Sequence, residues 1–170
     1  RYAAFDGLDR VIRIGSFSKT AASAIRCGHV ALRKDWVEPL ADLRIVTAYV
    51  GNPLGAELLA AMLTDGSYRH HMETIRSRLA RAMTRVARRL NDIGITPWCV
   101  PACGMSLWVR LPGGLDSADL ARRAVDEGII LAPGAVFSPS GGWADHMRVH
   151  VVHGDDERLY RFLERAVAAC

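Results

Sequence analysis

The chain has 170 residues, of which 50% are hydrophobic and 24% are charged. This balance is typical of a folded globular domain and excludes a disordered or low-complexity segment. No apolar run reaches the length of a membrane span and no secretion signal is visible, so we expect a cytoplasmic protein without a membrane partner.

The net charge is +4, and arginine supplies nearly all of the basic charge because Lys19 and Lys34 are the only lysines. A modest positive charge suits an anionic ligand such as a phosphate ester. The four cysteines form no C-x-x-C pair, so we expect free thiols and no metal site. The chain starts at Arg1 rather than Met, with a strand about ten residues later, which favours a fragment of a longer protein.

In chain order, the first half is predicted to place two short strands before three helices. Alternating β-branched residues favour strands at 11–14 and 26–32. Apolar spacing favours helices at 34–46, 53–65 and 67–90, the second of them entered through Asn52 and Pro53.

The second half changes to shorter elements that point to an α+β layer. The pattern favours strands at 95–100, 106–111, 129–131 and 147–152, a loop at 132–143, a helix at 116–127 and a last helix capped by Asp155. We therefore predict an α/β chain with a boundary inside the long helix. Residues 1–80 would belong to a larger sheet domain, and residues 81–170 would form a small α+β domain.

The sequence GSFSKT at 15–20 carries the most specific chemical signal. A strand ends, the hydroxyls of Ser16 and Ser18 flank Phe17, Lys19 follows directly, and Arg26 comes seven residues later. Hydroxyls and a guanidinium can together hold a phosphate, and an unprotonated lysine amine can condense with an aldehyde. Composition alone favours an exposed turn lysine instead. A P-loop does not fit, because serine replaces the glycine before the lysine and the spacing is one residue short.

The run VIRIGSFSKT followed by IRCG closely resembles the Schiff-base segment of class I/II aminotransferases, the pyridoxal-phosphate enzymes of fold type I. The resemblance implies the C-terminal part of that fold, namely the end of the large α/β domain plus a small α+β domain. It implies that pyridoxal 5'-phosphate is the cofactor and that Lys19 is the Schiff-base lysine. It also implies that Ser16, Ser18 and Arg26 hold the cofactor phosphate.

Three further segments extend the resemblance over nearly the whole chain. GMSLWVRLP at 104–112 is similar to a strand of the small domain, and LAPGAVFSP at 131–139 is similar to the family's P-G-x-x-F loop. MRVHVVH at 147–153 resembles the strand whose arginine binds the substrate α-carboxylate, which makes Arg148 that residue. Phe137 and Trp108 are expected to pack in the core rather than to contact a ligand.

The resemblance implies an aminotransferase that moves an amino group between an α-amino acid and a 2-oxo acid, in a homodimer. The family's glycine-rich loop, stacking aromatic ring, asparagine and ring-nitrogen aspartate have no counterpart among the 18 residues before Lys19. We therefore expect the isolated chain to be inactive. The main alternative is the aminotransferase-like sensor domain of a GntR/MocR-type transcription regulator, which would bind DNA through a winged helix-turn-helix ahead of this segment. A lyase or decarboxylase, or a folding and assembly module, would also carry these motifs.

Overall fold

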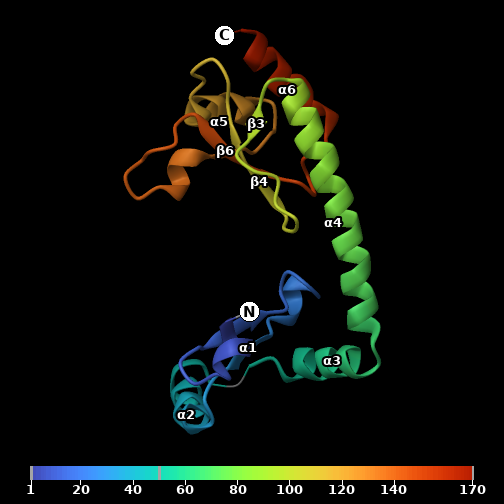
Figure 1. The fold of residues 1–170 in the computed structure, drawn as a ribbon, viewed down its shortest axis with the longest axis vertical. Coiled ribbons are helices and arrows are strands. Elements are labelled where there is room, and N and C mark those ends of the chain that lie inside the picture. Colours follow the sequence, from blue (N-terminus) through green and yellow to red (C-terminus); the bar gives the residue numbers. More distant parts are fainter. Residues whose placement is uncertain (1, 50, 170) are drawn as a thin grey trace. The chain divides into compact units, whose positions relative to one another are not determined.

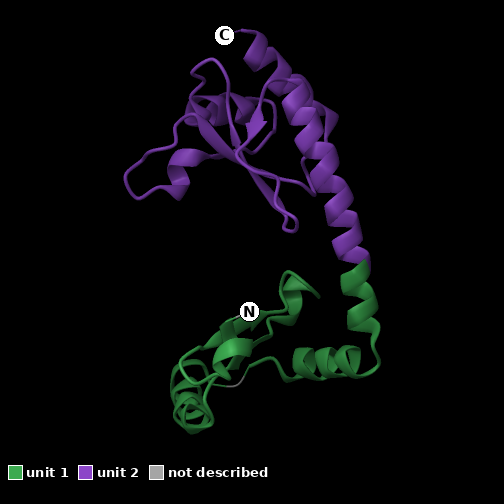
Figure 2. Cartoon of the chain, in the orientation of Figure 1, with its two compact units in different colours: residues 1–73 green, residues 74–170 purple. Residues whose placement is uncertain are grey.

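The computed structural model describes residues 2–49 and 51–169 and has a mixed α/β fold (Figure 1). The chain divides into two compact units, residues 1–73 and 74–170 (Figure 2). The division falls within α4 (Ser67–Asp92), the helix in which the sequence also predicts a domain boundary, seven residues further on. Assignment of the units to a large and a small domain stays a prediction.

The first unit contains one two-stranded hairpin and several helices. Its elements are α1 (Tyr2–Asp6), β1 (Arg13–Ser16), η1 (Ser23–Ile25), β2 (Gly28–Ala31), η2 (Lys34–Trp36), α2 (Val37–Ala48), α3 (Pro53–Thr64) and the first turns of α4. β1 and β2 pair antiparallel, with Arg13 opposite Ala31 and Ser16 opposite Gly28. The first strand therefore begins and ends two residues later than predicted, which places Ser16 inside it.

Little of the first unit is buried. Ile25 and Leu59 are its only buried hydrophobic side chains among the described residues, and α2 buries none. Apolar side chains such as Ile14 and Val46 are 78% and 83% exposed. An isolated two-stranded hairpin is marginally stable in water. The described residues of this unit therefore form no substantial hydrophobic core of their own.

The second unit is built on a four-stranded sheet. Its elements after α4 are β3 (Thr96–Pro97), β4 (Ser106–Arg110), α5 (Ser117–Asp126), β5 (Ala132–Pro133), η3 (Gly134–Phe137), β6 (His146–His150) and α6 (Glu157–Ala168). The strand order is β3-β4-β6-β5, and all three pairs are antiparallel. Figure 1 shows α4 and α6 side by side next to this sheet.

The core of the second unit lies between the sheet and its helices. Because side chains alternate along a strand, Leu107 and Val109 of β4 and Met147 and Val149 of β6 share one face. They form a buried cluster with residues from α4, α5 and α6, including Leu90, Leu120 and Leu163. The opposite face of the sheet carries Trp108 and Arg148, which are a cross-strand pair.

Three element predictions in the second half are wrong. The segment 132–143, predicted as a loop, contains β5 and η3. No strand forms at 129–131, because the amide of Ile129 donates to the Ala124 carbonyl at 2.9 Å and completes the end of α5, so pairing with β6 begins at Ala132. Asp156 rather than Asp155 caps α6, since the Asp155 carboxylate is held by Arg85 at 2.9 Å. The start of α3 at Asn52 and Pro53 is confirmed, with Asn52 as the cap, and Asp116 caps α5. In the described parts of the chain, no helix is both long and apolar enough to cross a membrane.

Candidate functional site

The GSFSKT motif lies where β1 ends and the chain turns back toward β2. The Phe17 amide donates to the Cys27 carbonyl at 3.0 Å, which extends the hairpin pairing by one step. The amides of Thr20 and Ala21 both donate to the Phe17 carbonyl, at 3.2 and 2.8 Å, and these bonds close a tight turn. Lys19 is therefore presented by a turn whose backbone is fixed by its own hydrogen bonds.

Three of the predicted site residues are joined by hydrogen bonds. The Ser18 amide donates to Ser16 Oγ at 3.2 Å, and Arg26 Nη1 donates to Ser18 Oγ at 3.4 Å. Arg26 has φ 53° and ψ 33°, the left-handed conformation that a residue with a side chain adopts rarely and at a cost of roughly 1–3 kcal/mol. These three residues thus form a hydrogen-bonded group in and beside the loop that connects β1 to β2.

Lys19 is exposed and directly follows Ser18. Among the described residues, its amine has no hydrogen bond or ion pair. A cavity of about 650 Å³ beside the hairpin is lined by Arg26, Gly28 and Asn52, whereas Lys19 is not part of its lining. The structure therefore joins Arg26 directly to Ser18, and Ser18 to Ser16, but it does not join Lys19 to Arg26 through a shared cavity.

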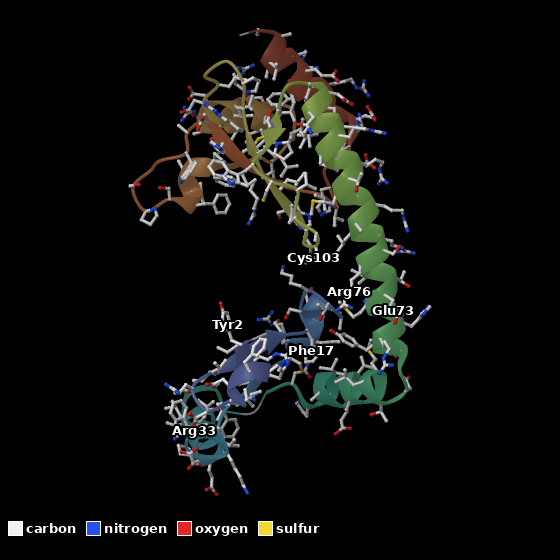
Figure 3. All side chains as sticks on the ribbon, in the orientation of Figure 1. Tyr2, Phe17, Arg33, Glu73, Arg76 and Cys103 are labelled. Atoms are coloured by element: carbon white, nitrogen blue, oxygen red, sulfur yellow. The ribbon has the colours of Figure 1, made fainter. Side chains whose placement is uncertain are left out.

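The first turn of α4 anchors the turn from one side. Tyr68 donates its hydroxyl hydrogen to Thr20 Oγ1 at 2.9 Å, and its ring meets the Phe17 ring edge-on at 5.6 Å and 73°. Figure 3 shows Phe17 directed toward the start of α4. Nothing in the sequence singles out Tyr68 as a residue that contacts the turn, because 48 positions separate it from Thr20.

The start of α3 anchors the segment before Arg26. Asn52 Oδ1 accepts from the Gly55 amide at 3.0 Å, and its Nδ2 donates to the Ile25 carbonyl at 3.1 Å. A Cβ at position 55 would lie 2.7 Å from that same carbonyl oxygen, so only glycine lets the helix approach so closely. The sequence predicts Asn52 as a helix cap, and the structure adds a second role in fixing η1.

Arg148 belongs to the second unit, where it occupies the middle of β6. It lies opposite Trp108 of β4 on one side and opposite Ala132 of β5 on the other. Its guanidinium carbon is 4.8 Å from the centroid of the Phe137 ring, and no ion pair links it to any residue in the described ranges. The expectation that Phe137 and Trp108 are core residues is wrong, because neither belongs to the buried cluster and Phe137 is 45% exposed.

The carboxylate near Arg148 in sequence is engaged elsewhere. His146 Nδ1 donates to Asp145 Oδ1 at 2.7 Å, and Arg110 Nε donates to Asp145 Oδ2 at 3.1 Å. The hydrogen bond from His146 holds the pKa of the Asp145 carboxyl below its ordinary value. The Asp145 carboxylate is therefore engaged by His146 and Arg110, and the described ion pairs leave the Arg148 guanidinium available for an external anion.

Curated relatives of this chain are bacterial transcription regulators. The chain is 25% identical over 153 residues to the HTH-type transcriptional regulator YdfD of Bacillus subtilis. This alignment covers 89% of the chain and 31% of YdfD. The chain is 32% identical over 136 residues to the HTH-type transcriptional regulator NorG of Staphylococcus aureus, covering 78% of this chain and 31% of the relative. The chain thus spans about a third of the length of these proteins.

Similar solved structures are aminotransferases. The α-aminoadipate aminotransferase LysN of Thermus thermophilus, solved with N-(5'-phosphopyridoxyl)-L-leucine, matches with a TM-score of 0.82 at 25% identity, over 99% of this chain and 44% of that one. A kynurenine aminotransferase of Pyrococcus horikoshii matches with a TM-score of 0.82 at 25% identity, over 97% and 41% of the two chains. These matches confirm the prediction of a fold type I aminotransferase fold. The sequence profile of aminotransferase class I and II matches residues 2–165, and the chain therefore belongs to the aminotransferase class I and II family.

Proposed function

We propose that these residues form the C-terminal part of a pyridoxal-phosphate-dependent aminotransferase that moves an amino group between an α-amino acid and a 2-oxo acid. The observation that carries the proposal is the hydrogen bond from Arg26 to Ser18, directly beside Lys19. This bond supports the proposal because it joins a cation to the hydroxyl of the residue that precedes Lys19 in the sequence, and Lys19 is the lysine that the family motif requires. The full-length protein would act as a homodimer, in line with its family.

The residues of the turn fit the phosphate of the cofactor. Ser16 and Ser18 offer hydroxyl donors, and Arg26 has no carboxylate partner among the described residues that would neutralise it. Arginine binds a phosphate through paired, charge-assisted hydrogen bonds. The left-handed backbone of Arg26 supports the same role, because strained residues cluster at ligand sites where the surroundings hold them.

Lys19 carries the amine that would bond covalently to the aldehyde of the cofactor. When bound, the pyridoxal ring supplies an electron sink for the electrons released at the substrate α-carbon. As a free amine, Lys19 Nζ would accept the proton released at the substrate α-carbon and hold it for return, as general base and then general acid. Lys19 is exposed on a fixed turn, which suits an amine that must be released from the cofactor and bind it again in each catalytic cycle.

Arg148 would orient the substrate by its α-carboxylate. A planar guanidinium binds a carboxylate through two parallel hydrogen bonds, and this arrangement fixes the direction of the bond to be broken. Arg148 is available to bind this carboxylate, since its described contact is with an aromatic ring and not with an anion. Within the 170 residues alone, we expect no catalysis, because no residue before Lys19 replaces the family's aspartate on the ring nitrogen.

A second candidate function is supported by the curated relatives. Both YdfD and NorG are HTH-type transcriptional regulators, so the chain could be the aminotransferase-like sensor domain of a GntR/MocR-type protein. The cofactor-binding residues would then serve ligand sensing rather than turnover. Purified full-length protein that shifts a promoter DNA fragment but converts no amino acid to its 2-oxo acid would favour the regulator. The opposite pair of results would favour the enzyme.

Cofactor binding can be tested with the two lysines of this chain. In the full-length protein, we expect Lys19→Ala to abolish the visible absorbance of lysine-bound pyridoxal phosphate. Lys34→Ala is the matched control, because Lys34 lies outside the motif at the start of η2, and it should leave the spectrum unchanged. A spectrum that survives Lys19→Ala and is lost in Lys34→Ala would overturn the assignment.

A further inference from the structure

Arg148 lies on the sheet face that is turned away from α4, α5 and α6. Its neighbours Met147 and Val149 are buried in the core, and strand alternation directs Arg148 to the opposite side. A long arginine side chain on an open sheet face normally samples many rotamers, and ordering it for a ligand costs conformational entropy. A neighbouring group that holds the guanidinium in place would lower this cost.

One aromatic ring contacts this arginine, and further rings support that ring. The Phe137 ring lies 4.8 Å from the guanidinium carbon, within the range of a cation–π contact. The Trp108 ring contacts the Phe137 ring edge-on, with 5.7 Å between the ring centroids and 87° between the ring planes. Trp108 is in turn stacked on the buried His146 ring at 5.7 Å and 19°. The position of Phe137 is thus supported by a ring that is itself fixed.

The backbone that carries Phe137 is also held in place. Phe137 ends the short helix η3, which begins at Gly134. The Gly134 amide donates to the hydroxyl of Ser117 at 3.2 Å, and Ser117 is 1% exposed. Such a buried bond ties η3 to the start of α5 and leaves the Phe137 ring little freedom to move away from Arg148.

We infer that Phe137 is a positioning residue that holds the Arg148 guanidinium ready for the α-carboxylate of the substrate. This inference rests on the proposed function, because it assumes that Arg148 binds that carboxylate. The described contact joins the Phe137 ring to the guanidinium carbon and is not a hydrogen bond, so it leaves the N–H groups free for two parallel hydrogen bonds to a carboxylate. Phe137 therefore sets the orientation of Arg148 without occupying its binding edge.

The test compares substrates with and without the carboxylate in full-length protein loaded with pyridoxal phosphate. Phe137→Leu removes the aromatic face but keeps an apolar side chain, and we expect it to weaken binding of an α-amino acid about tenfold. Binding of the corresponding amine, which lacks the carboxylate, should not change. Phe137→Tyr keeps the ring and should restore amino-acid binding. Val136→Ala is the control, since Val136 is 75% exposed in the same short helix.

A spectroscopic measurement on the 170-residue chain gives a second readout without substrate or cofactor. Ring current from Phe137 should move the side-chain proton signals of Arg148 upfield in the wild-type NMR spectrum. Phe137→Leu should return them to ordinary values, and Val136→Ala should not. Ordinary Arg148 shifts in the wild-type chain would overturn the inference, whether or not the variant folds.

Arg148→Ala separates failure of the inference from failure of the proposed function. If this variant lowers amino-acid binding but not amine binding while Phe137→Leu changes neither, Phe137 has no positioning role and the carboxylate assignment stands. If Arg148→Ala leaves the preference for amino acid over amine unchanged, the role of Arg148 is wrong and the inference falls with it. Cofactor retention should be intact in both variants.

Discussion

At Gly134, the chain passes so close to its own backbone that no side chain fits. A Cβ there would overlap the Trp143 carbonyl oxygen and lie 2.7 Å from the His146 carbonyl oxygen. Gly134→Ala should therefore destabilise the protein by roughly 1–3 kcal/mol, because neither backbone oxygen can move aside cheaply. Urea unfolding followed by circular dichroism measures the loss. Gly142→Ala is the matched control in the same loop, since its nearest described contact is the Ser138 hydroxyl at 3.5 Å, and equal losses in the two variants would contradict this account.

Individual residues show which parts of the candidate site can be predicted from the sequence. Ser18 and Arg26 are identified by a local motif, and the structure joins them by a hydrogen bond. Tyr68 and Phe137 are not, because their roles arise from contacts with Thr20 and Arg148 that depend on the folded chain. Spacing in the sequence carries no signal for an aromatic side chain that packs against a residue on another element.

Buried apolar residues and charged side chains both join α4 to α6. The guanidinium of Arg89 lies 3.6 Å from the centroid of the Tyr160 ring, and it pairs with Glu157 at 2.7 Å. Burial raises the pKa of Tyr160 to about 12, because the phenolate would lose its hydration between the helices. The folded state thus retains a proton that the unfolded chain releases near pH 10.

The raised pKa of Tyr160 predicts a loss of stability in alkali. Tyr160 contributes fully to stability below about pH 10, and this contribution falls by at most about 1.4 kcal/mol per pH unit as the pH rises toward 12. We expect Tyr160→Phe to flatten the decline in the free energy of unfolding over this range, as measured by urea unfolding at several pH values. Tyr2→Phe, at a position that is 86% exposed, should leave the slope as it is in the wild type. The same decline in Tyr160→Phe and wild type would count against this explanation.

Elements with strong local signals are predicted well from the sequence. The apolar stripe of α4 places Met83, Val86 and Leu90 in the core, as their spacing indicates. The strand at 129–131 is misplaced because apolar residues after a helix serve equally as its C-terminal cap and as a strand. Only the pairing of Ala132 with Arg148, a tertiary contact, decides between these alternatives.

Over the whole molecule, buried apolar surface is distributed unevenly between the two units. The second unit contains the entire buried cluster, with side chains from β4, β6 and three helices, whereas the first unit buries only Ile25 and Leu59 among its described hydrophobic residues. Since burial of apolar surface is the main favourable term in folding, the two units should differ in their ability to fold alone.

Expression of the units as separate fragments tests this difference. We expect residues 74–170 to unfold cooperatively and to give a well-dispersed NMR spectrum, because their core is complete within the fragment. Residues 1–73 should lack a cooperative transition, since their apolar side chains need cover from other parts of the full-length protein. A cooperatively folded monomer of residues 1–73 would contradict the conclusion that this unit buries too little apolar surface to fold alone.

The central claim is that Lys19 is the residue to which the cofactor becomes attached. Full-length protein loaded with pyridoxal phosphate can be reduced with borohydride, digested and mapped by mass spectrometry. The account predicts a pyridoxyl group on the peptide that contains Lys19, with Lys34 unmodified as an internal control on the same chain. A pyridoxyl group on Lys34 or on any other lysine, with Lys19 unmodified, would contradict it.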